Sequence, residues 1–303
     1  MHKVGYLGPK GTFSEEALLS SATPDSVEPV PCVSIYDTVV ALREGNVEWA
    51  IVPIENSLDG SISVTLDLLA DEAEDVRIVG ETLLTVRHSL IAAQAVELRE
   101  IDTVLTHPQV PGQCARFLRS ELPHARVLSA SSTAEAVREV VEDAQPGRAA
   151  LGTKLAAEIY GGTVVREGVQ DRGDNETRFV WLARGGEEAL RPAPLRRSDG
   201  ARGGGKEGGG DGSDERPWKT SLVFWGAGAD SPGWLVRCLN EFARRGINLT
   251  KIESRPRRER LGHYMFFVDL DGGLAGEDGV REAVADMREM CEEVRVLGSY
   301  PAA

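Results

Sequence analysis

The sequence predicts an α/β protein in two parts, a larger one over residues 1–183 and a smaller one over residues 217–303. In the larger part short apolar runs alternate with amphipathic stretches, which is typical of an α/β domain with a mostly parallel sheet. In the smaller part the patterns follow in the order β-α-β-β-α-β, the split ferredoxin-like order. Residues 184–216 are rich in glycine and have almost no apolar side chains beyond Leu190 and Leu195, so they predict a flexible linker.

In the larger part, strands are expected at the apolar runs and helices at the amphipathic stretches between them. The expected strands are Val4–Leu7, Ala50–Pro53, Ile78–Thr82, Ser89–Ala92, Thr103–Thr106, Arg126–Leu128, Ala149–Gly152 and Thr177–Leu182. The expected helices are Ser14–Ser20, Ser34–Glu44, Thr65–Asp71, Gln109–Glu121, Thr133–Glu142 and Lys154–Tyr160. The helix start at Thr133 is the clearest, because its hydroxyl can cap a first turn that carries acidic residues.

In the smaller part the same patterns are fewer and their order is unambiguous. The expected strands are Thr220–Trp225, Asn248–Arg255, His263–Asp271 and Val294–Ser299. One helix is expected over Gly233–Arg245, and a second is marked by Val280, Val284, Met287 and Cys291 at helical spacing. These elements give the β-α-β-β-α-β order.

Charge and composition exclude several classes of protein. Acidic residues outnumber basic ones by 48 to 34, a net charge of −14, which argues against binding to nucleic acid or to an anionic membrane surface. An anionic substrate would therefore need a local source of positive charge. No apolar stretch approaches the roughly 18 residues of a membrane span, and the apolar run at Val4–Leu7 leaves no room for a signal peptide. We expect a cytoplasmic protein.

Cysteine and histidine spacing gives no sign of a metal or of disulfides. The cysteines Cys32, Cys114, Cys238 and Cys291 lie far apart with no C-x-x-C pair. The histidines show none of the spacings of a zinc site. No nucleotide or dinucleotide motif is present either. We therefore expect neither a metal nor a cofactor.

The first candidate site is the glycine-rich turn Gly8–Thr12, which leaves the first strand and opens a helix at Thr12 or Ser14. Backbone N–H groups and the helix dipole at such a turn favour an anion, and Lys10 adds a charge. An ordinary capped helix start explains the same residues equally well.

Two further candidates follow strands in the same way. Asn56 and Ser57 come directly after the strand that ends near Pro53, where open α/β sheets bind their ligands. His107 and Gln109 follow the strand Thr103–Thr106. His107 could act as an acid, a base or a donor, although a lone histidine is more often structural. Turn-forming residues alone would also explain the first pair.

The last candidate is the strand Glu176–Val180 with its flanking Asp174 and Asn175. Arg178 carries a planar fork of donors that suits a carboxylate, and Thr177 places a hydroxyl beside it. Composition alone fits an ordinary strand end. In the smaller part, Asp230–Gly233 and Glu253–Pro256 show no chemistry that implies catalysis.

Taken in order, these motifs resemble the prephenate dehydratases. The motifs that carry the resemblance are Gly8–Ser14, Pro53–Ser57, His107–Gln109 and Asn175–Phe179. In addition, Gly246–Pro256, which ends in Glu-Ser-Arg-Pro, is similar to the ACT regulatory domain attached to these enzymes. Each motif is weak alone, but their common order is specific, and the likeness covers nearly the whole chain except the linker.

The resemblance implies a catalytic domain of two α/β lobes, similar to periplasmic binding proteins, with the active site between them. It implies conversion of prephenate to phenylpyruvate with loss of water and carbon dioxide. Thr177 is then the essential hydroxyl, a donor or polariser at the leaving group, and Arg178 anchors a carboxylate. The full catalytic set is Thr12, Ser14, Asn56, Ser57, His107, Gln109, Thr177, Arg178 and Phe179.

The resemblance further implies that ACT domains pair across subunits, giving a homodimer or homotetramer, and that phenylalanine binds there as an allosteric effector. A Pro-Gly loop at a helix start can present N–H groups to its carboxylate. The effector contacts expected are Pro232, Gly233, Trp234, Leu235, Asn248, Glu253, Ser254, Arg255 and Pro256. Trp234 stands where the family usually has a small residue, and its bulk is expected to narrow this pocket or to change the effector.

Two alternatives remain. A dehydratase that prefers arogenate would need an acidic partner for the ammonium group, and Glu55, Asp59 and Asp174 are candidates. A non-catalytic, two-lobed amino-acid sensor would share the architecture without turnover. A fused chorismate mutase is not expected, because no helical stretch precedes Val4.

Overall fold

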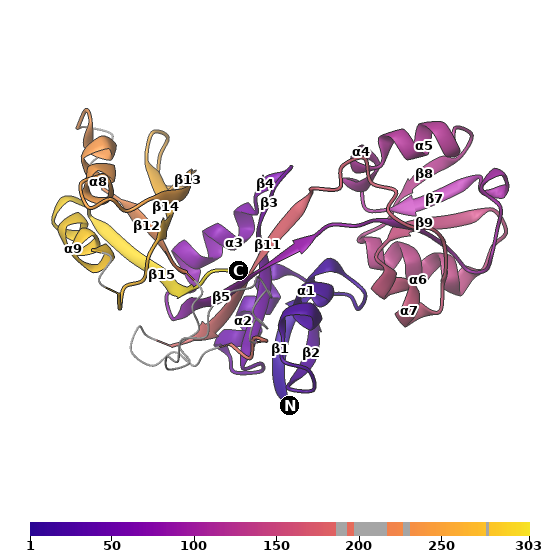
Figure 1. Ribbon diagram of the computed structural model, residues 1–303, viewed down its shortest axis with the longest axis horizontal. Coiled ribbons are helices and arrows are strands. Elements are labelled where there is room, and N and C mark those ends of the chain that lie inside the picture. The colour runs from indigo at the N-terminus through magenta and orange to yellow at the C-terminus, as the bar shows by residue number, and fades with distance from the viewer. Residues whose placement is uncertain (186–192, 197–216, 227–230, 277–278) are drawn as a thin grey trace, which may run out of the picture. The chain divides into compact units, whose positions relative to one another are not determined.

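The computed structural model describes residues 1–303 apart from four segments (Figure 1), which are 186–192, 197–216, 227–230 and 277–278. Most of the predicted linker, residues 184–216, thus lies outside the described residues. None of the described helices is long and apolar enough to cross a membrane.

The described chain forms two compact units that interleave in sequence. The first unit comprises Met1–Thr65 and Leu83–Phe179, and the second comprises Leu66–Thr82 and Val180–Ala303. The sequence analysis placed a single boundary near residue 183, whereas here a segment of the larger sequence part groups with the C-terminal residues.

Packing within the second unit explains this grouping. A Cβ added at Gly298 would collide with the carbonyl oxygen of Ile78, so the two backbones touch only because residue 298 is glycine. Lys219 Nζ lies 2.6 Å from Glu81 Oε1, and the Glu81 side chain is buried while that of Lys219 is 14 % exposed. Such close contacts join residues that are far apart in the chain.

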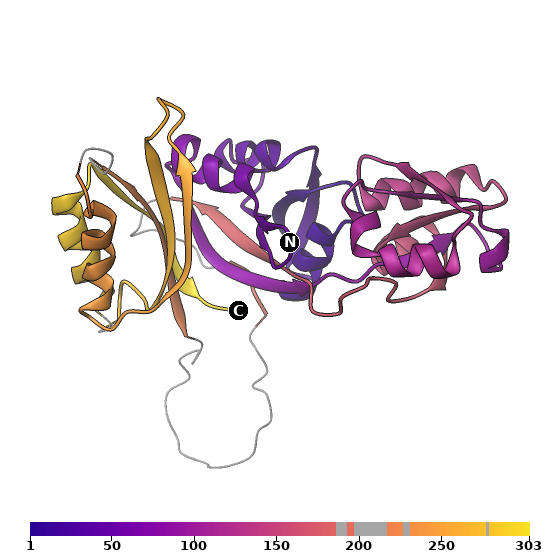
Figure 2. The same cartoon turned by 90° about the horizontal axis from the view of Figure 1, so that it is seen from above.

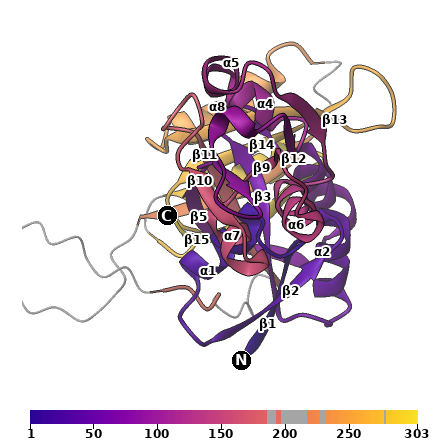
Figure 3. The ribbon, with the colours of Figure 1, turned by 90° about the vertical axis from the view of Figure 1, so that its right-hand side faces the viewer.

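The first sheet is formed by β1 (His2–Leu7), β2 (Val27–Cys32), β3 (Trp49–Asn56), β4 (Gly60–Ser61), β5 (Val76–Thr85) and β11 (Glu176–Arg184). Its strand order is β2-β1-β3-β11-β5, with β4 beside β3. Strand β1 pairs in parallel with both β2 and β3, as Figure 3 shows for β1 and β2. Strand β2 was not predicted, because Pro29 and Pro31 interrupt its pattern; the edge position of β2 tolerates them.

The helices connected to this sheet are α1 (Phe13–Ser21), α2 (Ile35–Arg43), α3 (Ser63–Asp67) and the π-helical turn η1 (Leu68–Glu72). The first two begin at hydroxyl caps: Thr12 caps α1 and Ser34 caps α2, each accepting a backbone N–H three residues on. Helix α1 therefore begins at Phe13, with Thr12 as its cap, one residue before the predicted start at Ser14.

The second sheet lies in the first unit. Its strands are β6 (Ser89–Ala92), β7 (Thr103–Thr106), β8 (Arg126–Ser129), β9 (Arg148–Gly152) and β10 (Thr163–Arg166), in the order β10-β6-β9-β7-β8. Strand β7 is parallel to β8 and β9, but β6 is antiparallel to β9 and β10. The sheet is mixed rather than mostly parallel.

Helices cover both faces of this second sheet. They are η2 (Leu98–Glu100), α4 (Val110–Gln113), α5 (Ala115–Glu121), α6 (Thr133–Asp143) and α7 (Lys154–Tyr160). Neighbouring strand residues belong to separate buried clusters, Leu90 with α4 and α5 and Ile91 with α6 and α7, because successive side chains point to opposite faces. The helix predicted over Gln109–Glu121 is broken at Cys114, whose φ and ψ are −122° and 24°.

The C-terminal sheet belongs to the second unit. Its elements are β12 (Trp218–Trp225), α8 (Trp234–Ala243), β13 (Leu249–Pro256), β14 (Tyr264–Asp271), α9 (Val280–Met290) and β15 (Glu293–Pro301). The β-α-β-β-α-β order is confirmed, and all neighbouring strands, in the order β13-β14-β12-β15, are antiparallel. Figure 2 shows α8 and α9 side by side on one face, where Phe242 and Met287 are fully buried.

Candidate active site

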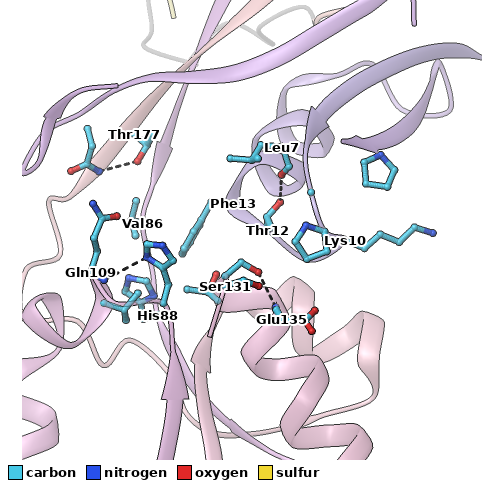
Figure 4. A pocket seen from close by; sticks show the side chains of 18 of the residues that line it. Leu7, Lys10, Thr12, Phe13, Val86, His88, Gln109, Ser131, Glu135 and Thr177 are labelled. Atoms are coloured by element: carbon cyan, nitrogen blue, oxygen red, sulfur yellow. Dashed lines mark hydrogen bonds between the residues drawn. The ribbon is translucent and has the colours of Figure 1, made fainter. Parts of the chain in front are cut away.

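A cavity of about 840 Å³ lies within the first unit. Its wall contains strand residues of the first sheet, such as Leu7 and Thr177, and residues that follow strands of the second sheet, such as His107 and Ser131. This volume is in the range of pockets that hold small ligands. The polar residues that line it are Lys10, Thr12, Asn56, Asp59, His88, His107, Gln109, Gln113, Ser131, Ser132, Thr133, Glu135, Tyr160, Asn175 and Thr177. Figure 4 shows Thr177, Phe13, His88 and Ser131 facing a common space.

The glycine-rich turn forms one wall of the cavity. Gly11 has a φ of +83°, and an added Cβ would lie 2.8 Å from Cα of Ala156, so only glycine fits. Thr153 Oγ1 donates to the Gly11 carbonyl at 2.6 Å, and the Tyr160 hydroxyl donates to the Lys10 carbonyl at 2.9 Å. These bonds hold the turn against α7.

The end of β3 places Asn56 beside Thr177. Asn56 Oδ1 accepts the backbone N–H groups of Leu58 and Asp59 at 2.9 and 3.0 Å, which is a local turn. Its Nδ2 then donates to Asn175 Oδ1 and to Thr177 Oγ1, both at 2.9 Å. Thr177 is thus an acceptor here, and among the described residues its hydroxyl hydrogen has no acceptor.

Gln113 and His88 continue the same network. Gln113 Oε1 lies 3.0 Å from His88 Nε2 and 3.5 Å from Asn175 Nδ2, and Gln113 Nε2 donates to Asp59 Oδ2 at 3.3 Å. Burial lowers the pKa of His88, so the imidazole is neutral at neutral pH.

Not all predicted site residues reach the cavity. Thr12, Asn56, His107, Gln109 and Thr177 line it, whereas the others do not. Ser14 is buried within α1.

The remaining predicted residues have structural partners. Ser57 Oγ donates to Asn175 Oδ1 at 3.2 Å and accepts the backbone N–H of Glu176. Phe179 is a core residue with 2 % exposure. Arg178 does not line the cavity; its Nη1 lies 3.5 Å from Glu55 Oε2.

The structure adds lining residues that the predicted catalytic set did not contain. They are Gln113, His88, the run Ser131–Thr133 at the start of α6, and Asn175, which the sequence analysis named only as part of a motif. Gln113 lies at helical spacing from Gln109, and the run of hydroxyls stands before a predicted helix; both signals were visible. The predicted cap Thr133 is wrong by one residue: Ser132 caps α6, since its Oγ accepts the N–H of Glu135 at 3.0 Å, and Thr133 is the first helical residue.

Positive charge around the cavity is sparse. Of the described lining residues, Lys10 is the only lysine or arginine, and its exposed side chain extends away from His88 in Figure 4. The N-terminus of α6 adds unpaired N–H groups and the positive end of a helix dipole. Among the described residues, no group of His, Cys, Asp or Glu could hold a metal ion.

Fold and cavity together indicate an α/β protein with a site of small-molecule size, lined by amide, hydroxyl and imidazole groups. Comparison with known proteins makes the class specific. The family model described as prephenate dehydratase matches residues 4–187. A bifunctional chorismate mutase/prephenate dehydratase of Aquifex aeolicus is 35 % identical over 302 residues, which cover 99 % of this chain and 74 % of that protein.

Two more relatives are similar along the whole chain. A prephenate dehydratase of Mycobacterium tuberculosis is 36 % identical over 309 residues, which cover 99 % of this chain and 87 % of that protein. The crystal structure of a prephenate dehydratase from Arthrobacter aurescens in complex with L-Phe has a TM-score of 0.82 at 34 % identity, and covers 99 % of this chain and 89 % of that one. The chain therefore belongs to the prephenate dehydratase family and is a carbon–oxygen lyase of aromatic amino acid biosynthesis.

Cys114, next to Gln113, should be unreactive in the folded protein. Burial, with a smaller contribution from Asp171, raises the pKa of its thiol to about 12. Since only the thiolate attacks alkylating reagents, we expect iodoacetamide at pH 8 to modify Cys114 at least about 100-fold more slowly in the native enzyme than in urea. Peptide mass spectrometry against time measures both rates; rapid native labelling would contradict the burial described here.

Proposed function

We propose that the enzyme binds prephenate in the cavity of the first unit, and that the Thr177 hydroxyl is the donor to the leaving hydroxyl group. The observation that carries this proposal is the direction of one hydrogen bond. Because Asn56 Nδ2 donates to Thr177 Oγ1, the threonine hydrogen is directed to another acceptor, and Thr177 lines the cavity.

The reaction needs a donor at one oxygen and no redox partner. The bond between the ring carbon and the leaving carboxylate breaks, and its electron pair enters the ring as carbon dioxide departs. The carbon–oxygen bond of the ring hydroxyl breaks at the same time, and this oxygen takes up a proton and leaves as water. Aromatisation of the ring supplies the driving force, and phenylpyruvate remains.

A threonine is a weak acid, so its surroundings must support the donor role. Asn56 Nδ2 points at Thr177 Oγ1 and stabilises negative charge that develops there when the hydroxyl donates its hydrogen. Both side chains are at least nine-tenths buried, and hydrogen bonds are stronger in such surroundings. The pair therefore acts as a fixed dipole aimed at the leaving group.

For the carboxylates of prephenate we propose Lys10 and the N-terminal turn of α6 as partners, in place of Arg178. Lys10 and Ser131 both line the cavity. Arg178 follows Thr177 directly in β11, and neighbouring strand residues face opposite sides. With Thr177 toward the cavity, Arg178 points to Glu55 instead.

Arogenate remains the second candidate substrate. Of the acidic residues considered for its ammonium group, Asp59 lines the cavity, Glu55 lies beside Arg178, and Asp174 pairs with Arg172. Asp59 is therefore the residue that would bind the ammonium group of arogenate. Initial rates with the two substrates at equal concentrations decide between them.

We further propose that the C-terminal sheet with its two helices is an ACT regulatory domain that binds phenylalanine, and that subunits pair through it as a dimer or tetramer. A separate cavity of about 330 Å³ lies within the second unit at the start of α8. Pro232, Gly233, Trp234 and Leu235 line it, as do His263 and Tyr264. The Arthrobacter aurescens enzyme is described in complex with L-Phe, which supports the choice of effector.

Other expected effector residues lie outside this cavity. Arg255 Nη2 pairs with Asp67 Oδ2 at 2.7 Å, and Asn248 Nδ2 donates to Asp271 Oδ2 at 2.9 Å. Glu253, Ser254 and Pro256 share the strand β13 with Arg255 and do not line the cavity either. Trp234 packs against Phe224 and Phe266, and its Nε1 donates to the Met290 carbonyl at 2.9 Å. Most of its side chain is therefore part of the hydrophobic core, and only part of it borders the cavity.

Removing the Thr177 hydroxyl should abolish most turnover. We expect Thr177→Ala to lower kcat on the order of 10²–10³-fold, the usual effect of losing a transition-state donor. Thr177→Ser keeps the oxygen and should retain part of the activity. Phenylpyruvate absorbance measures both variants, with circular dichroism as the control for folding. Near wild-type turnover by Thr177→Ala would remove Thr177 from the mechanism.

Lys10 and Arg178 should differ in their effect on substrate binding. Lys10→Met should raise KM about two- to five-fold, the size of an exposed ionic contact. Arg178→Lys keeps a charge beside Glu55 and should leave KM within about two-fold while lowering Tm. The opposite pattern, with KM raised only by Arg178→Lys, would restore Arg178 as the carboxylate anchor.

Phenylalanine should lose its effect when the C-terminal cavity is charged. Val236 lines that cavity and is 62 % exposed, so Val236→Asp should fold normally and weaken phenylalanine binding through repulsion of its carboxylate. Ile252→Asp is the matched control, because Ile252 is 50 % exposed and lies outside the cavity. Calorimetric titration and inhibition curves should shift for the first variant alone. Equal inhibition of all three proteins would place the effector elsewhere.

A further inference from the structure

We propose that His88 is a positioning residue of the active site: as the neutral Nε2–H tautomer it donates to Gln113 and holds the polar chain that ends at the Thr177 hydroxyl. This inference rests on the proposed function of Thr177. The predicted catalytic set does not contain His88, whose sequence context suggested a hinge between lobes, and the reaction described above makes no direct use of it.

The His88 ring has a single well-defined orientation. The residue is 1 % exposed, between β5 and β6. Its backbone N–H donates to Gln170 Oε1 at 3.0 Å, and its carbonyl accepts the N–H of Val169 at 3.0 Å. The ring meets Phe13 edge to face, with centroids 5.3 Å apart and an interplanar angle of 89° (Figure 4). Contacts on the backbone and on the ring therefore both restrain it.

The direction of every hydrogen bond in this polar network follows from Asn56, the residue at which the network is bonded to the backbone. Backbone N–H groups can only donate, so Asn56 Oδ1 faces Leu58 and Asp59, and Asn56 Nδ2 faces Asn175 Oδ1. The other end of that amide, Asn175 Nδ2, must then face Gln113 Oε1. Each amide is thus oriented by the one before it.

The contact of Gln113 with Asp59 assigns the same orientation to the Gln113 amide independently. An ionised Asp59 carboxylate can only accept, and it lies 3.3 Å from Gln113 Nε2. Gln113 Oε1 is therefore directed at His88 Nε2, 3.0 Å away, which must carry the hydrogen. Two separate routes through the network assign the same tautomer.

The second ring nitrogen completes the argument. His88 Nδ1 is buried, and no hydrogen-bond partner for it exists among the described residues. A proton on Nδ1 would be a buried donor without an acceptor, which costs more than a bare lone pair on a neutral ring. Burial also lowers the pKa of His88, in agreement with a neutral imidazole.

The consequence for the site is a fixed carboxamide at Gln113. With His88 in place, Gln113 Oε1 receives donors from two sides and Nε2 remains directed at Asp59. Without the Nε2–H donor, Gln113 Oε1 keeps only the longer bond from Asn175 Nδ2, at 3.5 Å, so the Gln113 amide is held less firmly. Asn56 and Ser57 still fix the oxygen of Asn175, and the loss of order is confined to Gln113 and its contact with Asp59 at the wall of the cavity.

Two substitutions at residue 88 separate positioning from packing. Glutamine can place its amide nitrogen near the position of imidazole Nε2, whereas the shorter asparagine places its nitrogen near Nδ1. We expect His88→Gln to keep kcat within about five-fold and His88→Asn to lower it about 10–100-fold, the loss expected when a buried acceptor loses its donor. If His88 only supports packing, the kcat values of His88→Asn and His88→Gln should instead fall in proportion to the loss of Tm in each variant.

A control variant and the comparison with Thr177→Ala separate this inference from the proposed function. His124→Asn, at an exposed position of the first unit, is the control and should leave kcat unchanged. If His88→Gln and His88→Asn both keep wild-type kcat while Thr177→Ala is inactive, the inference is wrong and the proposed function stands. If Thr177→Ala is active, the proposed function fails whatever the His88 variants do.

A measurement on the unaltered enzyme covers the case in which these variants do not fold. In ¹⁵N-histidine-labelled protein at pH 7, the His88 signals should show a protonated Nε2 and an unprotonated Nδ1. His88→Gln assigns the signals by their disappearance, or their assignment follows from the couplings of the ring. An Nδ1–H tautomer or an imidazolium would overturn the proposal.

Discussion

The side-chain amide of Asn56 is the constraint on which the site depends. Its oxygen is held by two backbone N–H groups of its own turn, so its nitrogen has one possible direction. That nitrogen reaches both Asn175 and Thr177, which the chain places 119 and 121 residues away. A local turn at the end of β3 thereby decides which way a hydroxyl in a distant strand can donate. The same turn sets the direction of every later bond in the network.

An acidic enzyme that acts on a dianion must concentrate positive charge locally, and here that charge is modest. With a net charge of −14, the chain offers Lys10 at the wall of the cavity together with helix N-termini. Backbone N–H groups and helix dipoles attract an anion without a mobile cation that a neighbouring carboxylate could neutralise. Arg178, the residue best suited by type, lies instead beside Glu55 in the interior.

The second unit is held by contacts that join distant segments of sequence. Asp67 accepts bonds from Arg255 and Arg258, Lys219 pairs with Glu81, and Arg295 reaches Glu74. Glu81 is 4 % exposed, so removing Lys219 would take a cationic partner away from a buried carboxylate, which is destabilising. These pairs explain why Leu66–Thr82 groups with the C-terminal residues, although the sequence pattern assigns it to the larger part.

Local signals in the sequence predict the β-α-β-β-α-β order of residues 217–303, most strands and helices, and the turns that carry the site, because periodicity, caps and glycines act over a few residues. They also indicate Thr177 and Asn56 through their place at strand ends. Tertiary structure alone decided that Thr177 rather than Arg178 faces the cavity and that Gln113, Asn175 and His88 meet there. Residue types show which atoms can donate or accept, but the choice among partners more than a hundred residues apart depends on how the strands pair and which face each side chain takes.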